Sequence, residues 1–269
     1  MALNLLPMKA LGILFSLVFI VSAYSQTDLE VLENSPRHQE WIELNNEGRT
    51  LYNFVVYPEI AEKAKVLIVI HENRGLNDWA RRFTDELASE GFIAIAPDLL
   101  SSTVEGKAKT SDFESFDAAR TALYNLNPNQ VISDLDTTFE YAKSIAAGNG
   151  QVSVVGFCWG GSQSFRYATH NLGLEEAFVF YGTAPKQPDE LVKIEIPVYG
   201  FYAGNDARVN STLPATEKQM KALGKFYTYD IYEGGGHGFM RSGAQPDASE
   251  GNKLARQKAW KDLLLKLKS

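Results

Sequence analysis

Short runs of β-branched and aromatic residues alternate along the chain with longer segments whose apolar residues recur at helical spacing. Residues 65–70 (KVLIVI) are apolar at nearly every position, which is typical of a strand buried on both faces of a sheet. Residues 79–90 then show helical spacing, and Gly91 ends that segment. The same alternation predicts further strands over residues 92–96, 151–157, 177–181, 197–202 and 226–232, and further helices over residues 133–147, 162–169 and 253–268.

Strands that alternate with helices predict an α/β protein with a mostly parallel, doubly wound sheet flanked by helices. Residues 49–57 (RTLYNFVVY) alternate between apolar and polar positions, and we expect them to form an antiparallel edge strand. The chain carries no internal repeat, low-complexity tract or linker-like segment. We therefore expect residues 26–269 to form a single domain.

The first 25 residues follow a different pattern. Their only charged side chain is Lys9, an apolar stretch covers residues 10–21, and small residues follow at Ala23 and Ser25. This order is typical of a secretory signal peptide. The apolar stretch is shorter than the roughly 20 residues that a membrane span needs. We therefore expect cleavage and export, to the periplasm or the medium, with no membrane association after cleavage.

The composition excludes several classes of protein. The chain has 26 Lys and Arg against 33 Asp and Glu, a net charge of −7, so a basic nucleic-acid-binding surface is not expected. One cysteine cannot form an intramolecular disulfide, and with four histidines it leaves little for a structural zinc site. We expect no metal and no organic cofactor. The sequence leaves the oligomeric state open, with a monomer as the simplest expectation.

A glycine-rich hexapeptide lies between the strand predicted at residues 151–157 and the helix that follows. Its sequence, Gly156-Phe157-Cys158-Trp159-Gly160-Gly161, has the spacing of the nucleophile elbow G-x-S-x-G, with a thiol in place of the hydroxyl. The glycines permit a strained turn, and a helix N-terminus favours a reactive thiolate. A buried, unreactive cysteine is the alternative interpretation. The position at a strand–helix junction favours Cys158 as a nucleophile.

A thiol nucleophile needs a base and a group that orients the base. Among the histidines, His237 lies between glycines (GGGHG) just after a predicted strand, whereas His71 ends a strand as a core or turn histidine would. Asp206 also follows a strand, although aspartate is a common turn residue there. The order Cys158, Asp206, His237 is the nucleophile–acid–histidine order of the α/β-hydrolase fold. We interpret these three residues as a catalytic triad.

Several segments at predicted strand ends carry a resemblance to a known family. They are residues 70–76 (IHENRGL), 96–99 (APDL), 156–161 (GFCWGG), 204–206 (GND) and 236–241 (GHGFMR). Through them the chain resembles the dienelactone hydrolase family, the carboxymethylenebutenolidases of the α/β-hydrolase superfamily, over most of its length. It is more specifically similar to exported members that carry the segment His-Glu-Asn-Arg-Gly-Leu.

The resemblance implies roles for the triad and for a nearby glutamate. Cys158 would be the nucleophile, His237 the general base and acid, and Asp206 the group that orients His237. Glu72 matches a family glutamate that interacts with the resting thiol and helps to activate it when substrate binds. A turn carboxylate paired with Arg74 is the simpler interpretation of Glu72.

The resemblance also implies groups that bind the substrate. The backbone N–H groups of Trp159 and Asn73 match an oxyanion hole, whose donors face the charge that develops on a tetrahedral intermediate. Arg241 matches an arginine that binds the substrate carboxylate. Arg120 and Tyr124 have the spacing of a second arginine and a tyrosine that line the same site, with a position on an exposed helix face as the alternative.

These inferences predict a hydrolase that cleaves a small ester or lactone, dienelactone-like and carrying a carboxylate, through a thioester acyl-enzyme. An exported esterase for another acyl or glycan ester is one alternative, because the aromatic-degrading members of the family act inside the cell. A non-catalytic binding protein on the same fold is another. The presence of Cys158, Asp206 and His237 together argues against the binding protein.

Overall fold

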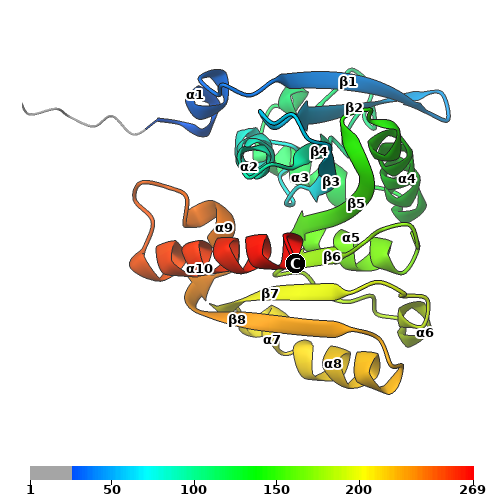
Figure 1. Cartoon of the computed structure of the whole chain (residues 1–269), viewed down its shortest axis with the longest axis vertical. Helices are drawn as coiled ribbons and strands as arrows, with labels where there is room; N and C mark the ends of the chain where they lie inside the picture. The colour runs from blue at the N-terminus through cyan, green and yellow to red at the C-terminus, as the bar shows by residue number, and fades with distance from the viewer. Residues whose placement is uncertain (1–25) are drawn as a thin grey trace, which may run out of the picture.

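A computed structural model of the chain describes residues 26–269, and the signal peptide predicted for residues 1–25 lies outside the described residues. In the described part, eight strands form one sheet in the order β1-β2-β4-β3-β5-β6-β7-β8 (Figure 1). Strands β3 to β8 are parallel, and β1 and β2 are antiparallel additions at one side. The bounds are β1 (Gln39–Asn46), β2 (Arg49–Val56), β3 (Ala64–Ile70), β4 (Ile93–Pro97), β5 (Gly148–Phe157), β6 (Ala177–Phe180), β7 (Val198–Asn205) and β8 (Tyr227–Gly236).

Helices connect the parallel strands and cover the sheet on both faces, so the α/β architecture expected from the sequence is confirmed (Figure 1). In the part of the chain that the structure describes, no helix is both long enough and apolar enough to cross a membrane. The helices are α1 (Asp28–Glu33), α2 (Asp78–Ser89), η1 (Thr110–Asp112), α3 (Phe116–Tyr124), α4 (Pro128–Ser144), α5 (Trp159–Ala168), α6 (Pro188–Leu191), α7 (Ala207–Asn210), α8 (Leu213–Ala222), α9 (Phe239–Ser242) and α10 (Glu250–Leu267).

The central strand β3 explains why its sequence is apolar almost throughout. Successive side chains of a strand point to opposite faces of the sheet. Leu67 and Val69 enter the core on one face, and Val66, Ile68 and Ile70 enter the core on the other. All five side chains are 0 % exposed. Both faces of β3 are therefore buried, as the sequence predicts.

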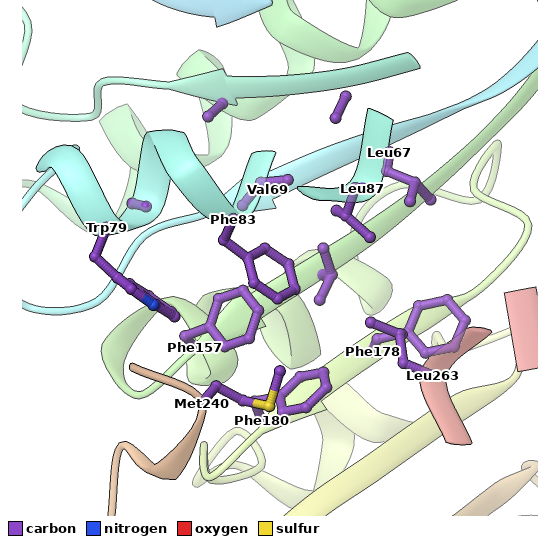
Figure 2. Packing of buried hydrophobic residues seen from close by; sticks show 14 of the residues in the cluster. Leu67, Val69, Trp79, Phe83, Leu87, Phe157, Phe178, Phe180, Met240 and Leu263 are labelled. Atoms are coloured by element: carbon purple, nitrogen blue, oxygen red, sulfur yellow. The ribbon is translucent and has the colours of Figure 1, made fainter. Parts of the chain in front are cut away.

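The strand that leads to Cys158 is held by aromatic packing on one face of the sheet (Figure 2). Helix α2 contributes Phe83 and helix α10 contributes Leu263 to the cluster that contains Phe157, the last residue of β5. The rings of Phe83 and Phe157 meet edge to face with their centroids 4.6 Å apart. Burial of a side chain of this size contributes roughly 1.5–3 kcal/mol. The residue before Cys158 is therefore fixed in position by the core.

The expectation that residues 49–57 form an edge strand needs correction. Strand β2 is antiparallel, as expected, but β1 pairs with it along its whole length and occupies the edge. The apolar pattern does not predict β1 (QEWIELNN), because glutamate and asparagine side chains interrupt it and most of its residues are only partly buried. The expected helix start at residue 133 is also late: α4 begins at Pro128, after the cap residue Asn127.

The carboxyl ends of five parallel strands meet at one edge of the sheet, which is where ligand sites form in α/β proteins. Each strand end carries a polar residue directly at the end or within two residues of it. These residues are Glu72 after β3, Cys158 after β5, Tyr181 after β6, Asp206 after β7 and His237 after β8. The topology thus gathers side chains that lie far apart in the sequence.

Candidate active site

Cys158 occupies a strained turn between β5 and α5. Its backbone has φ 56° and ψ −114°, a conformation that costs a non-glycine residue on the order of 1–3 kcal/mol and clusters at functional sites. The glycines make the turn possible: a Cβ on Gly156 would overlap the carbonyl of Gly160, and a Cβ on Gly160 would overlap the carbonyl of His71. The Cys158 N–H donates to the carbonyl of Phe180 at 3.0 Å. These contacts fix the sulfur at the carboxyl edge of the sheet.

Asp206, His237 and Cys158 form a continuous chain of polar contacts. His237 Nε2 lies 3.1 Å from Cys158 Sγ, and His237 Nδ1 lies 2.6 Å from Asp206 Oδ2. The second carboxylate oxygen of Asp206 accepts from the N–H of Val209 in α7 at 3.3 Å, which holds the carboxylate toward His237. The ring of Tyr181 packs edge-on against the imidazole, with centroids 5.1 Å apart. This is the geometry of a nucleophile, a base and a group that orients the base.

The surroundings of Cys158 keep the sulfur protonated in the resting site. Burial, and then the negative charge of Glu72, raise the pKa of the thiol to about 11. Three groups oppose this rise and lower the pKa of the thiol: the backbone N–H groups of Trp159 and Asn73 and the guanidinium of Arg208. At neutral pH the thiol therefore needs a base, and two backbone N–H donors already converge on the sulfur.

Glu72 is buried beside the thiol and pairs with an arginine from the other end of the chain. Its Oε2 accepts from Arg241 Nε at 2.7 Å, its Oε1 accepts from the Tyr181 hydroxyl at 3.2 Å, and its side chain is 5 % exposed. The alternative pairing with Arg74 is not formed, because that guanidinium lies over the ring of Phe116, 5.2 Å from its centroid. The resting site thus holds a carboxylate–arginine pair next to the thiol.

A cavity of about 480 Å³ opens over the thiol, within the usual size range of small-molecule sites. A larger hollow of about 1080 Å³ adjoins it and shares only Arg241 with it. The smaller cavity contains the reactive groups, so we assign the site there. Its lining residues are Glu72, Asn73, Tyr124, Cys158, Trp159, Ser162, Tyr181, Thr183, Arg208, His237 and Arg241.

The two residues expected to line this cavity from helix α3 differ in their positions. Tyr124 does line it, and its hydroxyl accepts from Asn73 Nδ2 at 3.3 Å. Arg120 does not: its side chain is 52 % exposed and pairs with Asp117 at 3.1 Å, one turn earlier on the same helix. Ala119 and Leu123 form the buried face of α3, so Arg120 and Tyr124 lie on the same outer face, and only Tyr124, the last residue of the helix, lines the cavity. The expectation for Arg120 is corrected accordingly.

Four residues at the cavity were not identified from the sequence: Ser162, Thr183, Tyr181 and Arg208. The last two contribute to the chemistry around the thiol. Arg208 lies in the short helix α7, two residues after Asp206, and Tyr181 follows β6 with φ 39°, a strained value for a non-glycine residue. The position of Tyr181 directly after a buried parallel strand is the signal that could have identified it. Arg208 carries no comparable signal, because an arginine near a turn is usually a surface residue.

The titratable groups at the site can move a proton and hold an anion. Among residues 26–269, no group of three or more His, Cys, Asp or Glu side chains is placed to hold a metal ion. The thiol of Cys158 and the imidazole of His237 are in direct contact. The guanidinium groups of Arg208 and Arg241 line the same cavity. An anionic small molecule could therefore bind within reach of the thiol.

The strand order together with the elbow at Cys158 defines an α/β-hydrolase. Comparison with protein families matches residues 51–269 to the dienelactone hydrolase family. The chain belongs to this family, and the resemblance stated from the sequence is confirmed. It is a hydrolase of the carboxymethylenebutenolidase type.

Individual relatives agree with this membership. A protein of Saccharolobus solfataricus assigned as a carboxymethylenebutenolidase is 30% identical over 247 residues, which cover 80% of this chain and 93% of that protein. A protein of a Bradyrhizobium species assigned as a 2-oxo-3-(5-oxofuran-2-ylidene)propanoate lactonase is 24% identical over 244 residues, 85% of this chain and 93% of that protein. A crystal structure from Klebsiella pneumoniae, assigned as a dienelactone hydrolase, shares the fold with a TM-score of 0.75 and 22% identity, covering 87% of this chain and 99% of that one.

Proposed function

We propose that the protein hydrolyses a small ester or lactone that carries a carboxylate, with Cys158 as the nucleophile. The observation that carries this proposal is the imidazole of His237, which lies 3.1 Å from the sulfur and 2.6 Å from Asp206. A structural cysteine needs no such base. A thiol whose pKa is raised to about 11 by burial and by Glu72 does need one to attack at neutral pH.

The reaction then proceeds in two halves. His237 takes the thiol proton as Sγ attacks the carbonyl carbon, and the N–H groups of Trp159 and Asn73 stabilise the oxyanion of the tetrahedral intermediate. The carbon–oxygen bond of the ester or lactone breaks, His237 gives its proton to the leaving oxygen, and a thioester to Cys158 remains. Water loses a proton to His237 and attacks the thioester. The carbon–sulfur bond breaks, and the proton returns to the sulfur.

A carboxylate-bearing substrate is supported by the charges that line the cavity. Arg208 and Arg241 both line it, one before and one after His237 in the sequence. Guanidinium groups are suited to bind carboxylates. The Bradyrhizobium relative is assigned to a lactone whose name includes a propanoate, which is itself a carboxylate.

A second candidate is an esterase for a larger acyl group. The hollow of about 1080 Å³ that shares Arg241 with the catalytic cavity favours this candidate, because a longer substrate could extend across Arg241. Its walls combine aromatic side chains, Trp41 and Phe113, with the cations of Arg74 and Lys109. The two candidates use the same triad and differ in the length of the substrate.

The decisive experiment compares the protein with its Cys158→Ala variant on a carboxylated dienelactone, on p-nitrophenyl acetate and on a long-chain p-nitrophenyl ester. We expect turnover of the lactone to fall by a factor on the order of 10⁴ or more in the variant, as on removal of a triad nucleophile. Cleavage of the long-chain ester with no lactone turnover would favour the second candidate. Equal rates for both proteins would overturn the role of Cys158.

A further inference from the structure

His71 is a buried histidine that takes no part in the triad. It directly follows β3 and is 0 % exposed. Its Nδ1 lies 2.8 Å from the backbone carbonyl of Glu72, and its Nε2 lies 3.3 Å from the backbone nitrogen of Leu99. A carbonyl only accepts and an amide N–H only donates, so Nδ1 carries the proton and Nε2 the lone pair. The imidazole is therefore neutral and its tautomer is fixed.

The hydrogen bond to the Glu72 carbonyl helps to determine where the next N–H points, and it is shorter than the other bond to that carbonyl, from the Gly75 N–H at 3.3 Å. The Glu72 carbonyl and the Asn73 N–H belong to one planar peptide unit, which is trans as are all peptide bonds in the described residues. In a trans peptide the two groups point in opposite directions. A donor that holds the carbonyl on one side therefore directs the N–H to the other side. Asn73 and Cys158 line the same cavity, and the Asn73 N–H lowers the pKa of the thiol.

His71 also contacts the segment that carries the second N–H donor. Its ring stacks on the ring of Trp159, with centroids 5.7 Å apart and an interplanar angle of 11°. The first turn of α5 also packs closely against the end of β3, since a Cβ on Gly160 would overlap the carbonyls of His71 and Ile70. One side chain thus contacts both chain segments whose N–H groups converge on the sulfur.

We infer that His71 is a positioning residue of the oxyanion hole, which orients the Asn73 N–H by a hydrogen bond to the same peptide and supports Trp159 by stacking. This inference rests on the proposed hydrolysis at Cys158. A donor to the carbonyl of a peptide also polarises its N–H, because hydrogen bonds in a chain strengthen one another. His71 itself does not touch the substrate, because it lies behind the peptide that it orients.

Three substitutions at one position separate the hydrogen bond from the packing. His71→Phe keeps an aromatic ring for the stack on Trp159 but has no donor. His71→Asn loses the ring but keeps an N–H on the atom bonded to Cγ, the place of Nδ1 in histidine. His71→Gln moves the amide nitrogen one bond further along the side chain, so its N–H is no longer at the place of Nδ1. The substitutions are made in the full protein, and circular dichroism and thermal melting establish that each variant is folded.

We expect His71→Phe to lower kcat on p-nitrophenyl acetate by about 10- to 100-fold, less than the 10²–10³ reported for outright removal of an oxyanion donor, with KM changed less than about threefold. We expect the kcat of His71→Asn to be about tenfold or more above that of His71→Phe and that of His71→Gln. Alkylation of Cys158 by iodoacetamide forms no oxyanion, so we expect its rate to change only a few-fold in all three variants.

Three results would overturn the inference: full kcat in His71→Phe, equal kcat in the Asn and Gln variants, or a loss of alkylation as large as the loss of turnover. If His71→Phe does not fold, the comparison of Asn with Gln decides alone. The Cys158→Ala variant keeps the two proposals apart. Turnover that depends on Cys158 but not on His71 would refute only the role of His71, whereas turnover without Cys158 would refute the proposed hydrolysis itself.

Discussion

Two buried carboxylate–arginine pairs lie in different regions of the molecule, one between structural elements and one beside the Cys158 thiol. Asp134 of α4 pairs with Arg49 at the start of β2, and Glu72 after β3 pairs with Arg241 of α9. The carboxylate side chains are 1 % and 5 % exposed, so burial alone does not distinguish the two pairs. The difference lies in what surrounds each pair.

The Asp134 pair is enclosed by structural groups. Its carboxylate accepts from Asn46 Nδ2 at 2.6 Å and from Gln130 Nε2 at 3.2 Å, and the Arg49 guanidinium also donates to the carbonyl of Ser101. Asn46 and Arg49 flank the turn of the β1–β2 hairpin. These bonds therefore attach the antiparallel hairpin to helix α4.

The Glu72 pair is arranged around the reactive sulfur. The carboxylate raises the pKa of the Cys158 thiol, and Glu72 and Arg241 both line the catalytic cavity. The partners of Glu72 are Arg241 and the strained Tyr181, and both lie at the carboxyl edge of the sheet. The comparison teaches that a buried ion pair can act on a neighbouring thiol only from a position beside it at this edge, and that burial alone does not distinguish such a pair from a structural one.

The largest effect expected from this comparison is on stability. Asp134→Ala leaves the guanidinium of Arg49 largely buried without its carboxylate partner, and breaking a buried pair in this way costs about 3–5 kcal/mol. We expect the free energy of unfolding in urea to fall by that amount. The kcat of the molecules that remain folded stays within about twofold of the original, since the pair does not line the cavity.

The control is Asp117→Ala, which breaks the exposed pair with Arg120. Exposed pairs contribute about 0–1 kcal/mol. A similar stability loss in both variants would contradict a structural role specific to the Asp134 pair. A loss of kcat in folded Asp134→Ala protein would contradict the separation of the two regions.

Much of the fold, and the proximity of Cys158, Asp206 and His237, could be predicted from the sequence because local patterns encode them. The apolar run of β3 and the spacing around Cys158 each reflect a constraint within a few residues, namely burial on both faces and a tight turn. Ion pairs obey no such local rule. Glu72 and Arg241 are 169 residues apart in the sequence. Only the folded structure shows that the nearer arginine, Arg74, lies over the ring of Phe116 and not beside Glu72.

The wrong prediction that Arg120 lines the cavity has a related cause. Spacing within a helix fixes which residues share a face, but it does not fix which turn of that face reaches a distant cavity. Arg120 and Tyr124 are four residues apart and share the face beside the buried Ala119 and Leu123, and only Tyr124, at the end of α3, lines the cavity. Arg208, which lines the cavity together with Arg241, is placed there by the end of β7, and a local sequence pattern does not show that position.

A smaller effect is expected on the reactivity of the thiol. Glu72→Gln removes a negative charge beside the sulfur and leaves the cation of Arg241 nearby. The loss of the negative charge and the unpaired cation of Arg241 both favour the thiolate. The pKa of Cys158 therefore falls below about 11, and alkylation by iodoacetamide at pH 8 becomes faster. Each unit by which the pKa falls raises the thiolate fraction about tenfold.

The measurement is the pH dependence of the alkylation rate. The original protein should show a rate that still rises above pH 9, and the variant should show the same rise at lower pH. Glu72→Asp, which keeps the charge, is the control and should stay closer to the original profile. Slower alkylation in Glu72→Gln than in the original protein would contradict the electrostatic role of Glu72.

The smallest effect is expected from a comparison of two arginines, one in the lining of the cavity and one outside it. Arg208 lines the cavity, whereas Arg120 is exposed and pairs with Asp117. We expect Arg208→Gln to lower kcat/KM for a carboxylate-bearing substrate about two- to fivefold relative to p-nitrophenyl acetate, corresponding to roughly 0.4–1 kcal/mol for an exposed ion pair. The ratio of the two substrates is the informative quantity, because Arg208 also lowers the pKa of the thiol and its loss slows both reactions. Arg120→Gln removes the same charge from an exposed position that does not line the cavity and should leave that ratio unchanged. If the two variants changed the ratio equally, the overall charge of the protein would explain the preference, and Arg208 would have no specific role in binding the carboxylate.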